Sequence, residues 1–229
     1  MPNGDLVQSK SYQSTGSASS HNVVLDAAPT QGNLVVIVWC SDAFVGASGV
    51  QTGYTQDAKA EDFPGLYCYS KIAGAGESAT ITINLSASDC CVAYAEERTG
   101  MQSPALDKTA SAIGQGTGTN VNTGTTATTT NANDVLYAAA GLFLTASQVV
   151  NSWDNSFTSK FGGASTGSVQ NVYLGAATKT VSSTGAYTAN ATLSRNGSSH
   201  DCGLIAAYKI SASTDESSLM AGRQCLTMP

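Results

Sequence analysis

The sequence predicts an all-β protein: an antiparallel two-sheet β-sandwich of jelly-roll type, built from two similar halves. Three observations lead to this prediction, namely short apolar segments between turn residues, the lack of a credible long helix, and an internal repeat. The chain has 229 residues, of which 41% are hydrophobic and only 11% are charged. A chain of this length and hydrophobicity can bury a substantial core without disulfides.

Four segments of the first half have the composition of strands. They are rich in β-branched or aromatic residues and end at turn-forming ones: "NLVVIVWC" (33–40), "GLYCYSKIA" (65–73), "ATITINLS" (79–86) and "CCVAYAEE" (90–97). Such short apolar runs between turn residues are typical of strands. The strict alternation in "TITINL" indicates a strand with one face on a core and the other in solvent.

The same order of segments recurs in the second half. Asn33 in the first segment matches Asn133, and Asp89-Cys90 in the last matches Asp201-Cys202. The repeat therefore predicts a strand in "NDVLYAAAGLFL", although its Ala and Leu residues favour a helix. About four strands from each half give the two sheets of a sandwich, because a sheet must bury its apolar face.

The repeat also predicts how the chain is divided. The sandwich covers residues 22–211, with halves at about 22–112 and 121–211. The polar segment 1–21 is expected to be an N-terminal arm or an edge strand, and residues 212–229 a C-terminal tail. The spacing between matched residues grows along the chain, which places an insertion at 151–168.

Charge and cysteine usage exclude several kinds of partner. The net charge is −6 and the ten basic residues are scattered, which argues against a nucleic-acid interface. No apolar run is long enough for a membrane span, and the N-terminus lacks the pattern of a signal peptide. We therefore expect synthesis in a reducing cytoplasm, with the cysteines as buried thiols. Without CxxC spacing, and with only two histidines, no metal or cofactor is expected.

The stretch "SDCCVAYAEER" (88–98) concentrates thiols, carboxylates and a tyrosine. In a strand, neighbouring side chains point to opposite faces, so Cys90 and Cys91 diverge, as do Glu96 and Glu97. A joint metal site or a glycosidase carboxylate pair is therefore not expected. The stretch is interpreted as an interior strand that leaves the core at Glu96.

The triplet His200-Asp201-Cys202 resembles a nucleophile with its base. A cysteine nucleophile needs a histidine within hydrogen-bond reach, and adjacent residues of a strand diverge. The matched Ser88-Asp89-Cys90 also has no histidine. No catalytic residues are predicted, and the protein is not expected to be an enzyme.

Partner contacts are predicted at four aromatic residues. Trp153, Phe157 and Phe161 lie in "WDNSFTSKFGG", which is either a binding loop or a loop tucked over the edge of the sandwich. Tyr12 belongs to the N-terminal segment, whose expected role is to contact neighbouring subunits.

The chain resembles a domain that recurs in virion proteins of tailed bacteriophages and prophages. The resemblance covers about residues 22–211 and rests on "GNLVVIVW", "LYCYSKIAGAGESATITINLSA", "CCVAYAEERTG" and "SPALDKTAS". The chain departs from this pattern at 96–98, where Glu-Glu-Arg replaces the more usual Glu-Tyr-Ser. The resemblance implies a β-sandwich at an exposed position on a capsid, tail or fibre, with frequent oligomers and no catalysis.

Together these features predict a capsid decoration or cement protein at the virion surface. Its partners would be the major capsid protein and copies of itself, in a dimer or trimer. The alternative is a carbohydrate-binding module of a tail or fibre. That module would bind a host glycan on Trp153, with Tyr173 or Tyr187 as a further sugar platform.

Overall fold

The structure is a computed structural model, which describes residues 2–42, 49–114, 118–144, 148–168, 170–194 and 200–212. These residues form sixteen β-strands and no helix, and the strand pairs are antiparallel. The predicted all-β antiparallel sandwich is therefore confirmed. The described part of the chain contains no helix with the length and apolar character needed to cross a membrane.

The first half contributes eight strands: β1 (Leu6–Gln13), β2 (Ala18–Val24), β3 (Leu34–Ser41), β4 (Gly49–Val50), β5 (Thr55–Glu61), β6 (Gly65–Ile72), β7 (Thr80–Asp89) and β8 (Cys91–Arg98). The second half contributes eight more: β9 (Met101–Ala112), β10 (Asn120–Thr125), β11 (Asn133–Leu144), β12 (Val150–Trp153), β13 (Thr158–Ala164), β14 (Asn171–Ser182), β15 (Thr188–Leu193) and β16 (Cys202–Ile210).

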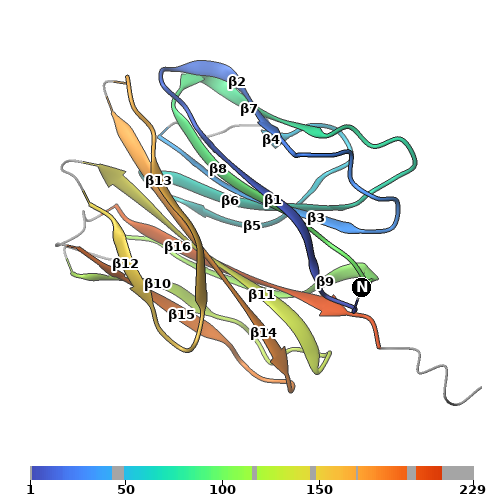
Figure 1. Ribbon diagram of the computed structural model, residues 1–229. Coiled ribbons are helices and arrows are strands. Elements are labelled where there is room, and N and C mark those ends of the chain that lie inside the picture. The colour runs from blue at the N-terminus through green and yellow to red at the C-terminus, as the bar shows by residue number, and fades with distance from the viewer. Residues whose placement is uncertain are drawn as a thin grey trace, which may run out of the picture.

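The strands of the described chain form four sheets in four layers. Two five-stranded sheets, β1-β8-β3-β6-β5 and β13-β14-β11-β16-β9, face each other at the centre. A three-stranded sheet covers the outer side of each, β2-β7-β4 over the first and β10-β15-β12 over the second. Figure 1 shows these layers, with the blue and green strands of the first half above the yellow and orange strands of the second.

The two halves have the same strand order. β1 of the first half corresponds to β9 of the second, β2 corresponds to β10, and so on up to β8 and β16. The sequence predicted about four strands per half in one two-sheet sandwich, with halves at about 22–112 and 121–211. Among the described residues each half instead has eight strands and two sheets, and the halves meet between β8 and β9, because β1 and β9 hold equivalent edge positions. The jelly-roll type is not confirmed, since each half divides its strands five and three and β5 pairs with β6.

Both faces of the central sheets are buried, which explains the uninterrupted apolar runs of the sequence. In β3, Val36 and Val38 point into the core between the five-stranded sheets, while Ile37 and Trp39 point toward the outer sheet. All eight residues of β3 are buried for this reason. The outer strand β7 has water on one side and so keeps the alternating "TITINL" pattern.

The segments outside the clearest repeats are mostly strands as well. The expected arm contains β1, which is an edge strand paired with β8. It also contains most of β2, which pairs with β7. The expected insertion 151–168 contains most of β12 and all of β13. These strands correspond to β4 and β5 of the first half. Except for Ala212, the expected tail lies outside the described residues.

Lysines mark the edges of both central sheets. The chain has seven lysines, and four of them lie on the four edge strands, as Lys10, Lys59, Lys108 and Lys160. Each of these strands also has a register shift in its pairing. Lysines and bulges discourage further strands from pairing with an edge, so the central sheets are protected against extension.

Candidate functional site

Residues 91–98 of this stretch form β8, Ser88 and Asp89 end β7, and the side chains from Cys90 onward alternate as the sequence predicted. Cys90, Val92 and Tyr94 face the central core, while Cys91 and Ala93 face the outer sheet of the first half. The two thiols therefore lie on opposite sides of the sheet. The expectation that the strand leaves the core at Glu96 is wrong, because Glu96, Glu97 and Arg98 are all buried.

Glu96 and Arg98 form a buried ion pair between the two halves. Arg98 Nη2 lies 2.7 Å from Glu96 Oε2, and Arg98 Nη1 donates to the carbonyl of Gly4 at 2.9 Å. Tyr94 donates to Glu96 Oε1 at 2.6 Å and Tyr137 donates to Oε2 at 2.8 Å. The charges are thus paired and hydrogen-bonded, which is the condition for burying them.

Glu97 points to the opposite face of the same sheet, where it binds the segment that precedes β3. Its Oε1 accepts hydrogen bonds from the amide of Thr30 at 2.8 Å and from Asn33 Nδ2 at 2.6 Å. Its Oε2 accepts a bond from Gln8 Nε2 at 2.5 Å. Both glutamates are therefore engaged in structural contacts on opposite faces.

The thiols are buried in the core. Burial raises the pKa of Cys40, Cys68, Cys91 and Cys202, which favours the protonated thiol. His200 Nδ1 lies 3.2 Å from Asp62 Oδ1, whereas Cys202 points inward to the carbonyl of Pro64. Among the described residues, no group of three His, Cys, Asp or Glu side chains is placed to hold a metal ion.

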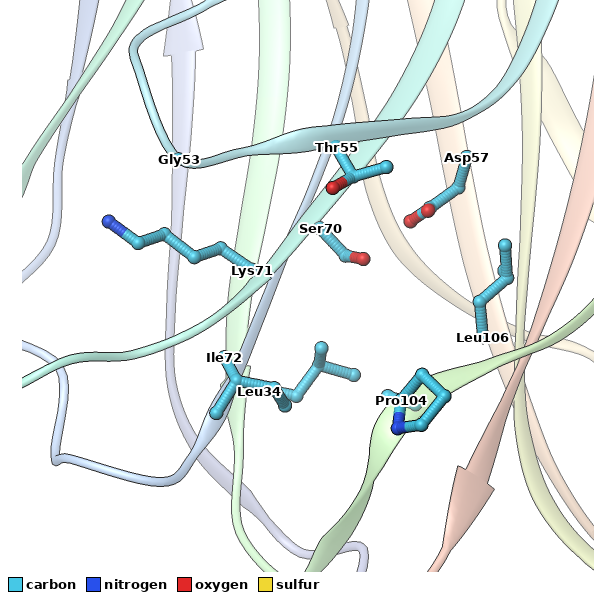
Figure 2. A pocket seen from close by; sticks show the side chains of 10 residues that line it. Leu34, Gly53, Thr55, Asp57, Ser70, Lys71, Ile72, Pro104 and Leu106 are labelled. Atoms are coloured by element: carbon cyan, nitrogen blue, oxygen red, sulfur yellow. The ribbon is translucent and has the colours of Figure 1, made fainter.

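A groove of about 400 Å³ opens where the two halves meet. Side chains of β3, β5 and β6 line it from the first half, and the start of β9 lines it from the second. In Figure 2 the oxygens of Thr55, Asp57 and Ser70 gather at one side of the groove. Leu34, Ile72, Pro104 and Leu106 form the apolar part of its wall.

Asp57 is fixed in this groove by both halves. Tyr208 of β16 donates to Asp57 Oδ2 at 2.6 Å, and Ser70 of β6 also hydrogen-bonds the carboxylate. Burial raises the pKa of Asp57, and the two hydroxyl groups offset part of this effect. The side chain is therefore oriented by neutral donors.

Lys71 also lines the groove, but its ammonium group pairs with Glu77 and not with Asp57. Its Nζ lies 2.7 Å from Glu77 Oε2 and 5.6 Å from the ring centre of Tyr54. Figure 2 shows the ammonium group extending away from Asp57 toward Gly53. In the described part of the chain, no lysine, arginine or histidine forms an ion pair with Asp57.

A second hollow, of about 480 Å³, lies beside the turn between β12 and β13. Asn155, Phe157, Lys179 and Tyr187 are among its lining residues. Lys179 Nζ donates to the carbonyl of Asn155 at 2.8 Å and lies 5.9 Å from the ring centre of Phe157. The hollow thus combines amide, ammonium and aromatic groups.

The structure brings together only two of the four predicted contact residues. Trp153 and Phe157 pack into the same apolar cluster under the outer sheet, and Phe157 is only 7% exposed. Phe161 stacks on Tyr94 over the central core, with 5.9 Å between ring centres. Tyr12 lies 3.0 Å from His21 Nδ1 at another place on the first half.

Sequence reasoning did not find Asp57 or its partners. Asp57 and Tyr208 are 151 residues apart, and no local pattern links them. The local sequence offers only the Asp57 carboxylate itself, in the strand "TQDAKAE", whose buried residues are Ala58 and Ala60. Comparison of the chain with protein-family models, with curated proteins and with solved structures finds no match.

Proposed function

We propose that the protein is a non-enzymatic structural component of a virion, a decoration or cement protein that lies on the outer shell and bridges capsid subunits. The observation that carries this proposal is the lack of charge on the two outer sheets. Their six strands contain one charged residue, Asp89. Depletion of charge distinguishes the core of a protein interface from ordinary surface.

The outward faces of these sheets carry hydroxyl and amide side chains. Thr82 donates to Asn22 Oδ1 at 2.9 Å in the first half. At the equivalent place in the second half, Asn122 Nδ2 donates to Asn190 Oδ1 at 2.6 Å. Neutral polar groups cost less to desolvate than charges, so such faces suit contact with other proteins.

The arrangement of the halves supports bridging. The two outer sheets lie on opposite sides of the molecule, separated by the central core. The Glu96–Arg98 ion pair and its tyrosine donors connect the halves within that core. A rigid body with two similar contact faces can hold two neighbouring subunits at a fixed distance.

The test is attachment to phage shells assembled without this chain. The purified protein is expected to bind such shells and raise their melting temperature. Asn84→Lys, on β7, adds a charge to one outer face and is expected to weaken attachment. Ser159→Lys adds the same charge on the edge strand β13 and is the matched control. No binding by the wild-type protein, or equal attachment of both variants, contradicts the proposal.

A second candidate function is carbohydrate binding, and the hollow beside Tyr187 favours it. Aromatic rings with nearby amide and ammonium groups are common features of sugar sites. Tyr187 is half-buried and its hydroxyl donates to the carbonyl of Ser183, which fixes the ring. Saturable binding on a glycan array that Tyr187→Ala abolishes, without binding to shells, would favour this function over the first.

A further inference from the structure

The groove between the halves holds a carboxylate for which the described part of the chain supplies no cationic partner. Among the described residues, Asp57 is bound only by hydroxyl groups, while the nearest lining cation, Lys71, is paired with Glu77. An ionised carboxylate in a partly buried position is stabilised by an opposite charge. The groove therefore presents an unmatched negative charge to whatever enters it.

The backbone aims Asp57 into the groove. Gln56 pairs with Tyr69 and Ala58 pairs with Cys68, so Asp57 is the extra residue of a β-bulge. Bulges re-aim a side chain and are frequent beside functional sites. The bonds from Tyr208 and Ser70 then hold the carboxylate in place, so its position is set before any ligand binds.

The rest of the groove is apolar. Leu34, Ile72, Pro104 and Leu106 form its walls, with the hydroxyl groups of Thr55 and Ser70 beside the carboxylate. This combination matches a side chain with an aliphatic stem and a cationic end. A volume of about 400 Å³ also leaves room for flanking backbone.

We propose that this groove binds a lysine or arginine side chain of a partner protein. The stem would pack against Ile72 and Leu106, and the cationic group would pair with Asp57 and the hydroxyl oxygens of Thr55 and Ser70. The net charge of −6 favours the approach of a basic partner. Binding of a basic side chain in this groove does not depend on a virion location.

The test is an NMR titration of the full-length, isotope-labelled protein with three capped tripeptides: Ala-Lys-Ala, Ala-Arg-Ala and Ala-norleucine-Ala. The two basic peptides are expected to shift the methyl signals of Leu34, Ile72 and Leu106, whereas the norleucine peptide is not. Asp57→Asn keeps the acceptor for Tyr208 and removes the charge. It is expected to weaken binding about tenfold, as for the loss of a charge-assisted hydrogen bond.

Asp26→Asn is the matched control, because Asp26 is an exposed carboxylate paired with Lys10 outside the groove. It is expected to leave binding unchanged. A second variant, Leu106→Lys, places an ammonium group of the chain itself at the groove and is expected to block the peptides. Amide spectra show whether each variant is folded.

Three results would overturn the proposal. The first is that the basic peptides shift no groove signals, and the second is that Asp57→Asn binds them as well as the wild type. The third is that the partner protein is a second copy of this chain. Lys160 is exposed on β13, so self-association that is abolished by both Asp57→Asn and Lys160→Gln would make the occupant a second copy of this chain.

Discussion

Asp57 and Lys160 occupy equivalent positions in the two halves, and each is the extra residue of a β-bulge on an edge strand. Lys160 lies between Ser159 and Phe161 in the pairing of β13 with β14, as Asp57 lies between its neighbours in the pairing of β5 with β6. The duplicated fold has thus kept the same backbone irregularity with opposite charges. In the first half the bulge faces the groove, whereas Lys160 is exposed.

The buried ion pair between Glu96 and Arg98 is expected to be essential for stability. Arg98→Met leaves the Glu96 carboxylate buried without a cation, at a cost of about 3–5 kcal/mol in the free energy of unfolding. Urea denaturation measures this loss. Lys10→Met removes an exposed ion pair with Asp26 and is expected to cost less than about 1 kcal/mol. Equal losses in the two variants would show that the buried pair has no special role.

Asp134 is expected to make stability depend on pH. Its side chain is buried at the start of β11, its Oδ2 has no hydrogen-bond partner among the described residues, and Asp107 and Lys209 are the charged groups near it. Burial, opposed by the hydrogen bond from Asn131 and by Lys209 and reinforced by Asp107, raises the pKa of Asp134 to about 6. A raised folded-state pKa favours the protonated form, so this contribution to stability is present below about pH 4 and is lost as the pH rises through 6.

Asp134→Asn removes this titration and can donate an amide hydrogen to Asp107. Relative to the variant, the wild-type protein is expected to lose about 1–2 kcal/mol of unfolding free energy between pH 4.5 and 7.5. Urea denaturation at both pH values measures the difference. The exposed Asp26→Asn variant should keep the wild-type pH profile. A wild-type and Asp134→Asn difference that does not change with pH would contradict the assignment.

The core thiols are expected to resist alkylation in the folded protein. Cys40, Cys68, Cys91 and Cys202 are inaccessible, and burial raises the pKa of each, so little thiolate is available to react. Treatment with iodoacetamide at pH 8, followed by peptide mass spectrometry, should find these four unmodified until urea is added. Rapid native labelling of Cys202 would contradict its burial.

Gly203 is expected to be required for the packing of an outer strand. A Cβ atom at this position of β16 would lie 2.4 Å from the backbone carbonyl oxygen of Asn122 in β10. Gly203→Ala should therefore cost about 1–3 kcal/mol, the usual range for overpacking. Gly16→Ala is the control, because no atom of the described residues lies within 4 Å of its Cβ position, and it should change stability by less than about 0.5 kcal/mol. Thermal unfolding of both variants tests this difference.

Local patterns predicted the strands with the clearest side-chain periodicity. The segments around Val36, Ile81 and Ala93 are strands, and the repeat correctly identified the Ala-rich segment 133–144 as a strand. Strands with mixed polar composition, such as β5 and β9, were not predicted. Their sequences lack a clean period because each is an edge strand with a bulge or a register shift.

The residues of the candidate site were harder to predict from the sequence than the strands were. Trp153 and Phe157 stood out because they are aromatic residues in a polar segment, and the fold packs both into a cluster under an outer sheet. Asp57 gave no comparable signal, since its hydrogen-bond donor Tyr208 comes from the other half. A site built from distant strands leaves no spacing that can be recognised along the chain.

The sequence by itself determined an all-β chain of two similar halves and the opposite facing of Cys90 and Cys91, because strand periodicity and repeats are local properties. Only the tertiary structure decided that each half forms two sheets, that the halves share one core, and that this core buries Glu96 with Arg98. It also decided that Asp57 faces a groove between the halves. These features depend on which sheet packs against which, and that choice is made by contacts between residues far apart in the chain.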